Sequence, residues 1–512
     1  MSQPRPIVWS IAGNDSAGGA GLAADLRAAE ALGVHLCPVV AAVTAQNSRA
    51  VTQVAPVAPE VLDAQLAALA DDMPPAAIKT GLLGSAAHIA GVARWVDRLR
   101  QRARVALVVD PVLGASTGAA FADESALAAY RELLLPRATV LTPNRREAGR
   151  LAAMPGAAAP ALAAALRATG AQAACVTGGD DAAAAQCALD WIDTPHAAGW
   201  LALPRIATRH THGTGCTFAT GAAAALALGF VPADALVLAK MATAHALAEG
   251  YAAGQGAGPV AARSGFARQP ALLPLMSWDE GSQFNGAQTA PSPAQDLGLY
   301  AIVDSAARVR QAVAAGVRTV QLRIKEPPGE PALRQAIVEA LAACRAAGAT
   351  LVVNDHWRLA AELGAPAIHL GQEDLLALGA AGRAELAASG LRLGISSHSL
   401  WELCRARGLR PWYIACGPVW PTLTKAMPWL PQGLDNLSWW ARMAGAPVVA
   451  IGGVLQPAQL TEAVRGGASS VCVVRGLGDD LAATVPRWQA ALTEGRAAPR
   501  LPTPDLPHPT LR

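Results

Sequence analysis

The stretch TLVVNDHWRLAAELGAPAIHLG (350–371) shows the pattern that decides the fold of the second half of this chain. One apolar run ends at Asn354 and Asp355, a helical stretch follows, and a second apolar run ends at Gly371. Short apolar runs separated by helical stretches are typical of parallel strands whose two faces are covered. The number of such units decides between an open, doubly wound sheet and a closed barrel.

The same pattern repeats on both sides of this stretch. The apolar runs are LYAIVD (299–304), TVQLRI (319–324), TLVVND (350–355), AIHLG (367–371), LRLGISS (391–397), WYIACG (412–417), VVAIGG (448–453) and SVCVV (470–474). A helical stretch or a long loop fills each gap. Eight evenly spaced units favour closure, so residues 297–490 are predicted to form a (β/α)8 TIM barrel.

The first half alternates β-like runs with Ala-rich helical stretches and predicts an α/β domain with a parallel sheet over residues 1–253. Its candidate strands are 7–13, 36–44, 76–81, 105–110, 139–144, 173–179 and 200–205. Residues 254–296 are rich in Gly, Pro, Ser and Ala, which predicts a linker. Residues 491–512 are Pro-rich and are predicted to form a disordered tail.

Composition limits the function classes. The chain has 512 residues, of which 52% are apolar and 15% charged, which argues for sizeable cores and against extended disorder. The net charge of +3 excludes the basic excess of a dedicated nucleic-acid-binding protein. The apolar run at 218–230 is too short to cross a membrane, and the start shows no signal-peptide pattern. The eight cysteines form no CxxC pair, which predicts reduced thiols in a cytoplasmic protein.

Three segments of the first half are suited to phosphate chemistry. AGNDSAGGAG (12–21) follows a strand, and its glycines either let the backbone approach a ligand or serve only a tight turn. Residues 213–216 precede an Ala-rich helix, where free N–H groups would bind an anion and acidify Cys216; a helix start with a buried Cys is the alternative. Asp110, Asn144 and Glu147 follow strands where carboxylates would suit Mg²⁺, although Asp110 alone could be an ordinary cap.

Six motifs together resemble the hydroxymethylpyrimidine/phosphomethylpyrimidine kinases of the ribokinase-like superfamily, over about residues 6–250. They are IAGNDSAGGAGLAADL (11–26), VTAQN (43–47), AIKTGLLGS (77–85), DPVL (110–113), LTPNRREA (141–148) and THGTGCTFATG (211–221). The resemblance implies a ribokinase-like three-layer α/β domain. It also implies Mg²⁺- and ATP-dependent phosphorylation of hydroxymethylpyrimidine (HMP) and then of HMP phosphate.

The resemblance also implies roles for single residues. Gln46 would read the pyrimidine and Asp25 would line the substrate pocket. Gly213, Thr214, Gly215 and Cys216 would form the anion hole, with Cys216 as the catalytic group. Asp110 and Glu147 would bind Mg²⁺, Asn144 would help to organise Mg-ATP, and Lys240 would neutralise phosphate. One departure is Thr177, where many relatives have Lys.

The second half places cations and carboxylates at the ends of its candidate strands. Gln321, Arg323 and Lys325 lie on one strand face because strand side chains alternate. Two cations that point together into a barrel mouth are costly unless an anion lies between them. Asp355 and Asp374 follow successive strands and are placed to share one Mg²⁺. The alternative is a solvated rim with incidental salt bridges.

Lysine is scarce, and its positions favour a functional rim. The chain has only four lysines, Lys79, Lys240, Lys325 and Lys425. Two of them lie at this rim, and Arg does not replace Lys at a site that needs a compact charge.

Residues 298–480 resemble thiamine phosphate synthases. The matching motifs are QLRIK (321–325), VVNDHWRLAAELGAPAIHLGQEDL (352–375), GISSHS (394–399), CGPVWPTLTK (416–425) and AIGGV (450–454). The resemblance implies condensation of HMP diphosphate with a thiazole phosphate, which gives thiamine phosphate and diphosphate.

The implied roles in the barrel fall into three groups. Gln321, Arg323, Lys325 and Asn354 would hold the pyrimidine diphosphate, Asp355 and Asp374 would bind Mg²⁺, and Ser396 and Lys425 would contact the diphosphate. Thr422, Thr424, Gly453, Val474 and Arg475 would receive the thiazole phosphate. Arg475 stands where relatives commonly have Ser. The ring releases diphosphate as a resonance-stabilised cation, so the site must neutralise diphosphate and position thiazole, with no strong base.

The leading hypothesis is a fused bifunctional enzyme of thiamine biosynthesis that acts on small molecules, without nucleic-acid or membrane partners. A pyridoxal-type kinase fused to a thiazole tautomerase-like barrel is an alternative, which QLRIK and the paired Asp residues disfavour. In a third reading one half is a non-catalytic ligand-sensing module, supported by Thr177 and Arg475. The sequence leaves the oligomeric state open, a homo-oligomer included.

Overall fold

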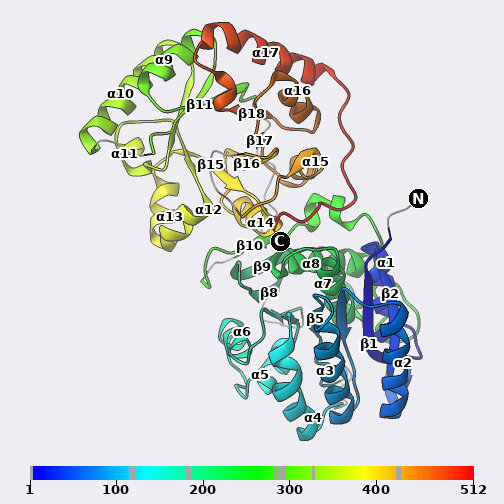
Figure 1. The fold of residues 1–512 in the computed structure, drawn as a ribbon. Helices are drawn as coiled ribbons and strands as arrows, with labels where there is room; N and C mark the ends of the chain where they lie inside the picture. The colour runs from blue at the N-terminus through cyan, green and yellow to red at the C-terminus, as the bar shows by residue number, and fades with distance from the viewer. Residues whose placement is uncertain are drawn as a thin grey trace. The chain divides into compact units, whose positions relative to one another are not determined.

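The computed structural model of the chain describes residues 4–114, 121–179, 186–281, 284, 296–325, 329–422 and 428–511. Its internal contacts divide the chain into two units, residues 1–288 and 289–511. Each unit has a sheet of its own (Figure 1).

The described part of the first unit is built on a ten-stranded sheet in the order β10-β9-β8-β7-β6-β5-β4-β1-β2-β3. The strands are β1 (Ile7–Asp15), β2 (His35–Gln46), β3 (Val51–Pro56), β4 (Ala77–Thr80), β5 (Ala106–Val109), β6 (Val140–Leu141), β7 (Ala174–Thr177), β8 (Cys187–Asp193), β9 (Ala198–Pro204) and β10 (Leu275–Met276). From β2 to β7 the neighbours run parallel, as the sequence predicts. β3 and the β8–β10 extension are antiparallel additions, and β3, β8 and β10 were not predicted.

Helices cover both faces of this sheet and confirm the three-layer prediction (Figure 1). The helices are α1 (Gly21–Ala31), α2 (Pro59–Asp72), α3 (Ala86–Arg100), α4 (Glu124–Ala129), α5 (Arg145–Leu151), α6 (Ala159–Ala168), α7 (Thr214–Ala227) and α8 (Pro232–Ala248), with the short turns η1 (Tyr130–Leu134) and η2 (Leu135–Arg137). α7 contacts α1, α8 and the strands β1, β4 and β5. Both α7 and α8 are Ala-rich and mostly buried, because small side chains let helices lie close to a sheet and to each other.

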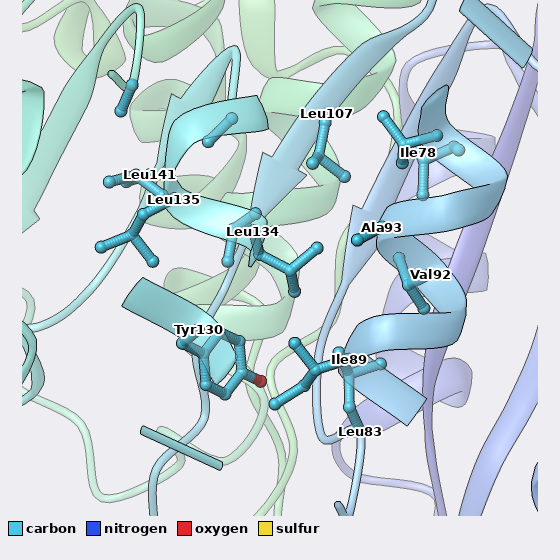
Figure 2. Packing of buried hydrophobic residues seen from close by; sticks show 14 of the residues in the cluster. Ile78, Leu83, Ile89, Val92, Ala93, Leu107, Tyr130, Leu134, Leu135 and Leu141 are labelled. Carbon is cyan, nitrogen blue, oxygen red and sulfur yellow. The ribbon is translucent and has the colours of Figure 1, made fainter. Parts of the chain in front are cut away.

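The other face of the sheet holds the large apolar core. Ile78 and Leu107 come from neighbouring strands, and Figure 2 shows them with Ile89 and Val92 of α3 and with Tyr130 of η1. All belong to one cluster of buried residues. Burial of this apolar area stabilises β4 and β5, and it therefore fixes the loop after β5 that carries Asp110.

Residues 254–281 correct the linker prediction, because they belong to the first unit. β10 pairs antiparallel with β9, and Val260 N donates to His212 O at 3.0 Å. Phe266, in the turn η3 (Phe266–Arg268), is 1% exposed. Gly and Pro are frequent here because the segment turns often, at η3 and again at η4 (Pro270–Leu272), and not because it is extended. Residues 285–295 lie outside the described residues.

The second unit is a closed parallel barrel, as the sequence predicts, with helices around its strands (Figure 1). Its strands are β11 (Leu299–Val303), β12 (Thr319–Leu322), β13 (Thr350–Asn354), β14 (Ala367–Leu370), β15 (Arg392–Ser397), β16 (Tyr413–Cys416), β17 (Val448–Ala450) and β18 (Ser470–Val473). Its helices are α9 (Ala306–Ala314), α10 (Glu330–Ala346), α11 (Trp357–Glu362), α12 (Gln372–Ala377), α13 (Gly379–Ala388), α14 (Leu400–Arg407), α15 (Gly433–Met443), α16 (Pro457–Arg465) and α17 (Leu481–Ala497), with the turn η5 (Arg475–Leu477). β11 pairs with β18 and closes the ring, which places all eight strand ends on one rim.

The predicted disordered tail is also corrected. α17 continues to Ala497, and the segment after it is held by α15 and by the residues just before that helix. His508 N donates to Asn436 Oδ1 at 2.8 Å, and Asn436 Nδ2 donates to His508 O at 3.0 Å. Leu430 N donates to Thr510 O at 2.8 Å. Proline lowers the entropy of an extended segment, so these few hydrogen bonds are enough to order it.

We expect Asn436→Ala to lower the free energy of unfolding of the barrel by about 1–3 kcal/mol, because the amide satisfies both backbone groups of His508. Urea denaturation followed by tryptophan fluorescence measures this change. In a chain that ends at residue 497 the same substitution should cost much less. An equal cost in both chains would mean that Asn436 does not hold the tail.

Candidate active sites

The first candidate site lies at the carboxyl ends of the parallel strands, where the two glycine segments of the first unit meet. A Cβ on Gly19 would lie 2.2 Å from His212 Cδ2, and one on Gly213 would lie 2.2 Å from Gly19 O. Gly213 also has a φ of +88°. Glycine at both positions therefore permits a close approach of two loops, in addition to the turns that they form.

α7 begins at this contact and offers free donors. Gly213 is its N-cap, and no side chain of the described residues caps the helix. Thr214 N donates to Thr211 O at 3.3 Å. The N–H groups of Gly215 and Cys216 are therefore the ones that can bind an anion, which the partial positive charge of the helix end also attracts.

The thiol of Cys216 differs from the prediction. Burial raises the pKa of Cys216 to about 12, Lys79 opposes the rise, and the charges of Asp25 and Asp110 add to it. The expectation that the helix dipole acidifies this thiol is therefore wrong. Desolvation outweighs the dipole, and the group is a neutral S–H donor.

Asp25 does not line a pocket, which corrects another expectation. Its side chain is completely buried, and Lys79 Nζ lies 3.0 Å from both Oδ1 and Oδ2. Ser10 Oγ donates to Oδ2 at 2.6 Å, and Thr220 Oγ1 donates to Oδ1 at 2.7 Å. Thr220 lies one turn after Cys216 on α7, so this carboxylate ties the helix to β1 and β4.

A pair of carboxylates lies beside this network. Burial raises the pKa of Asp110 to about 7; the charge of Lys79, at 3.9 Å, opposes this, and the charges of Glu147 and Asp25 add to it. Glu147 Oε1 accepts from Leu113 N at 3.1 Å, and Glu147 forms a capping box with Asn144 at the start of α5. A buried carboxylate whose pKa is raised by a second carboxylate favours a cation, and Mg²⁺ takes one or two protein carboxylates plus waters and phosphates.

Lys240 is not a free phosphate-binding cation, contrary to the prediction. It is buried, and its Nζ donates to Asp190 Oδ2 at 2.6 Å. Asp190 Oδ1 also accepts from Gly178 N at 3.0 Å. The pair therefore supports the start of the loop after Thr177, and the charge of Lys240 is already balanced.

Gln46 lines a cavity of about 420 Å³. The cavity is lined by Ser16, Ala17, Gln46, Asn47, Ser48, Arg49, Ala253, Gly254 and Gln255. Gln46 Nε2 lies 3.2 Å from His212 Nε2, and the same His212 atom lies 2.9 Å from Asp15 Oδ2. His212 therefore links Asp15 to Gln46, the residue that was predicted to recognise the pyrimidine.

The second candidate site is the rim and interior of the barrel. A chain of hydrogen bonds crosses it from β12 to β15. Gln321 Nε2 donates to Tyr300 OH at 2.8 Å, Tyr300 OH lies 2.8 Å from Tyr413 OH, and His369 bridges Tyr413 OH at 2.9 Å and Ser396 Oγ at 3.0 Å. Gln321 and Ser396, which were predicted separately, are the two ends of this chain.

The histidine in this chain is neutral. Burial lowers the pKa of His369 to about 4, and the charges of Arg323 and His398 add to the effect. Gly394 is required beside it, because a Cβ there would lie 2.2 Å from the Tyr413 ring. The interior is therefore polar but uncharged, which suits a neutral heteroaromatic ring.

Three charged residues, Arg323, Asp355 and Asp374, lie near the ends of the barrel strands. Burial raises the pKa of Asp355, Asp374 adds to the rise, and Arg323 and a hydrogen bond from Asn354 oppose it. Asp355 and Asp374 are therefore close enough to repel each other, with Arg323 beside them. The structure thus brings together four predicted residues in an arrangement that fits Mg²⁺ and diphosphate.

The remaining predicted residues lie around the same rim. Trp420 N donates to Gly452 O at 3.1 Å, so the loop with Thr422 adjoins Gly453. Val474 is half-buried against the interior, whereas the side chains of Arg475 and Lys325 are exposed. Thr424 and Lys425 lie outside the described residues.

Each candidate site lies in a part of the chain that matches a known protein family. The phosphomethylpyrimidine kinase family matches residues 15–261, and the thiamine monophosphate synthase family matches residues 299–477. A rice protein described as a probable thiamine biosynthetic bifunctional enzyme, chloroplastic, is 34% identical over 470 residues, which cover 88% of this chain and 81% of that protein. The chain belongs to the family of bifunctional thiamine biosynthetic enzymes.

Each half of this thiamine enzyme also matches single-domain relatives. A thiamine-phosphate synthase from Rhizobium etli is 46% identical over 203 residues, which are 39% of this chain and 97% of that protein. A hydroxymethylpyrimidine/phosphomethylpyrimidine kinase from Synechococcus elongatus is 42% identical over 258 residues, which are 50% of this chain and 96% of that protein. The fused kinase–synthase organisation predicted from the sequence is confirmed.

Several residues of the thiamine enzyme's sites escaped the sequence analysis: Ser10, Asp15, Lys79, His212, Thr220, Tyr300, His369 and Tyr413. The scarcity of lysine was a usable signal for Lys79, since a Lys inside an apolar strand needs a buried partner. The alternation of strand side chains was a signal for His369, which faces inward two residues after the buried Ala367. No helix in the part of the chain that the structure describes has the length and hydropathy to cross a membrane.

Proposed function

We propose that the first unit uses Mg-ATP to phosphorylate HMP and then HMP phosphate, and that the second unit joins the resulting HMP diphosphate to thiazole phosphate. The observation that supports the kinase half most strongly is the uncapped start of α7 beside the buried Asp110 and the half-buried Glu147. The synthase half is supported by Arg323 beside the mutually repelling Asp355 and Asp374, above a neutral polar interior. The product of the first reaction is the substrate of the second.

In the kinase half, Gln46 would bind the ring and the first turn of α7 would hold the transferred phosphoryl group with its N–H donors. The S–H of Cys216 would add a donor at the same place, which is consistent with its raised pKa. Asp110 and Glu147 would hold Mg²⁺. When bound, this ion would neutralise phosphate charge. Lys79 would balance the carboxylates around it.

In the synthase half, Gln321 and the tyrosine–histidine chain would hold the aminopyrimidine. Arg323 and the exposed Lys325, together with Lys425, would bind the diphosphate whose charge grows as it leaves. Asp355 and Asp374 would hold Mg²⁺, with Asn354 beside them. Thr422, Gly453 and the backbone of Val474 and Arg475 would hold the thiazole phosphate, so that its nitrogen lies near the cation.

The purified full chain tests this proposal directly. With ATP, Mg²⁺, HMP and thiazole phosphate it should form thiamine phosphate, and omission of ATP should stop formation unless HMP diphosphate is supplied. Pyridoxal in place of HMP should be phosphorylated much more slowly. Formation of no thiamine phosphate from either HMP or HMP diphosphate would refute the proposal.

We include a cytoplasmic location in this proposal. All eight cysteines carry free thiols, which is usual in reducing compartments. The rice and Arabidopsis thaliana relatives are described as chloroplastic, so localisation of a tagged chain in its own cell is the appropriate test.

Cys216→Ala should lower the kinase kcat about a hundredfold and leave the KM for HMP nearly unchanged, because a donor to the transferring phosphoryl group acts mainly in the transition state. Steady-state ADP release measures both constants. Cys216→Ser keeps a donor and should recover much of the loss, and synthase activity from supplied HMP diphosphate should not change. A wild-type rate in Cys216→Ala would make this residue a packing thiol.

A further inference from the structure

His212 contacts two polar groups, the carboxylate of Asp15 and the side-chain amide of Gln46, through one ring nitrogen. Its Nε2 atom is 2.9 Å from Asp15 Oδ2 and 3.2 Å from Gln46 Nε2. Asp15 is 6% exposed and accepts hydrogen bonds from the backbone N–H groups of Ala17, Gly19 and Ala20 at 2.8–3.0 Å. Burial alone would raise the pKa of Asp15, but the hydrogen bonds from His212, Ala20 and Ala17 lower it. Asp15 is therefore an ionised group that can only accept.

An ionised Asp15 requires a proton on His212 Nε2. A nitrogen that carries a proton cannot also accept from the NH₂ group of Gln46. The oxygen and nitrogen of a Gln amide have the same shape and are assigned from their partners. The amide of Gln46 must therefore turn its oxygen towards His212, so that one N–H of the ring serves Asp15 and Gln46 together.

The hydroxyl group of Thr44 is consistent with this orientation of the Gln46 amide. Thr44 Oγ1 donates to Asn14 O at 3.2 Å and lies 3.4 Å from the other amide atom of Gln46. With the amide turned, that atom is the nitrogen, and one of its hydrogens points to Thr44 Oγ1, which is free to accept. The second hydrogen is left for the cavity that Gln46 lines.

We propose that His212 is a specificity-determining, positioning residue of the kinase: it fixes the amide of Gln46 so that an N–H donor faces the substrate. The inference rests on the proposed function, in which Gln46 meets the ring. The site then binds a neutral heteroaromatic ring that presents a nitrogen lone pair, and it discriminates against a ring that presents an N–H at that place. Without His212 the amide can rotate, and half of its orientations turn the oxygen to the ring.

The test is a double-mutant cycle on the full chain with HMP and ATP as substrates. His212→Leu removes the N–H and should raise the KM for HMP about tenfold, which is the effect of losing about one hydrogen bond. The kcat should stay within about twofold. His212→Gln keeps a donor at the position of Nε2 and should restore the KM to within about threefold. His196→Leu, a change at an exposed histidine in the β8–β9 turn, is the matched control and should leave both constants unchanged.

The cycle separates positioning from a merely structural role. In a Gln46→Ala background, His212→Leu should have little further effect on the KM, because no amide remains to be oriented. An equal rise in both backgrounds, a loss confined to kcat, or failure of His212→Gln to rescue would overturn the inference while wild-type turnover of HMP keeps the proposed function. A wild-type chain that does not phosphorylate HMP would refute the proposed function and this inference together.

Discussion

Lys79→Met is expected to lower the HMP kinase rate about a thousandfold and to destabilise the first unit. The ammonium lies 3.0 Å from both oxygens of the fully buried Asp25 and 3.9 Å from Asp110. Its removal leaves these carboxylates without their buried cation, and breaking a buried ion pair typically costs about 3–5 kcal/mol. Urea denaturation followed by tryptophan fluorescence measures the destabilisation, and ADP release with HMP measures the rate.

A second variant separates folding from electrostatics. Lys79→Met combined with Asp25→Asn removes both charges of the pair, so it should regain much of the stability. It should still be slow, because the positive charge beside Asp110 and Cys216 is gone. Synthase activity from supplied HMP diphosphate is the internal control and should persist in both variants. A double variant with the wild-type kinase rate would show that Lys79 serves folding alone.

Asp355→Asn and Asp374→Asn are expected to lower the synthase kcat/KM by two to three orders of magnitude, which corresponds to about 3–4 kcal/mol. Both should also raise the Mg²⁺ concentration that gives the half-maximal rate. Asn is the appropriate replacement for two reasons. Asp355 has a φ of +67°, which Asn tolerates, and Asp374 Oδ2 accepts from Gly371 N at 2.8 Å, which an amide oxygen can replace.

Glu373→Gln is the matched control for this pair. Glu373 lies beside Asp374 in the first turn of α12, carries the same charge and is exposed. Its replacement should change neither the rate nor the Mg²⁺ midpoint, and the kinase should survive all three substitutions. If the Mg²⁺ midpoint stays the same in both Asp variants, Asp355 and Asp374 do not bind the metal.

The barrel could be predicted because each of its βα units has a pattern that can be recognised within a short stretch of sequence. Each apolar run of the barrel ends at a polar residue or a glycine or is followed directly by one, and eight such units admit few folds. The short edge strands β3 and β10 carry little periodic signal, so their pairing could not be predicted. The composition of residues 254–281 gave a wrong prediction, because the burial of Phe266 depends on packing against α8, which lies outside this segment.

The sequence indicated which segments form the candidate sites, but not which partners the side chains contact. Asp25 was expected in a pocket because its neighbours in sequence lie there, yet its partners Lys79 and Thr220 are 54 and 195 residues away. Lys240 was expected to be free, and its partner Asp190 is 50 residues away. The pKa of Cys216 likewise depends on burial by other elements. Charge balance in an interior is a property of the folded chain, which spacing along the sequence does not reveal.

The pairing of β10 with β9 bears on how the two halves of this protein can be separated. Without β10 the sheet of the first unit would end at β9, whose outer N–H and C=O groups would be open to strands from other molecules. A kinase half cut at residue 253 would therefore be prone to aggregate even if its active site were intact. The stretch that resembles a tether in composition thus supplies the strand that pairs with the β9 edge.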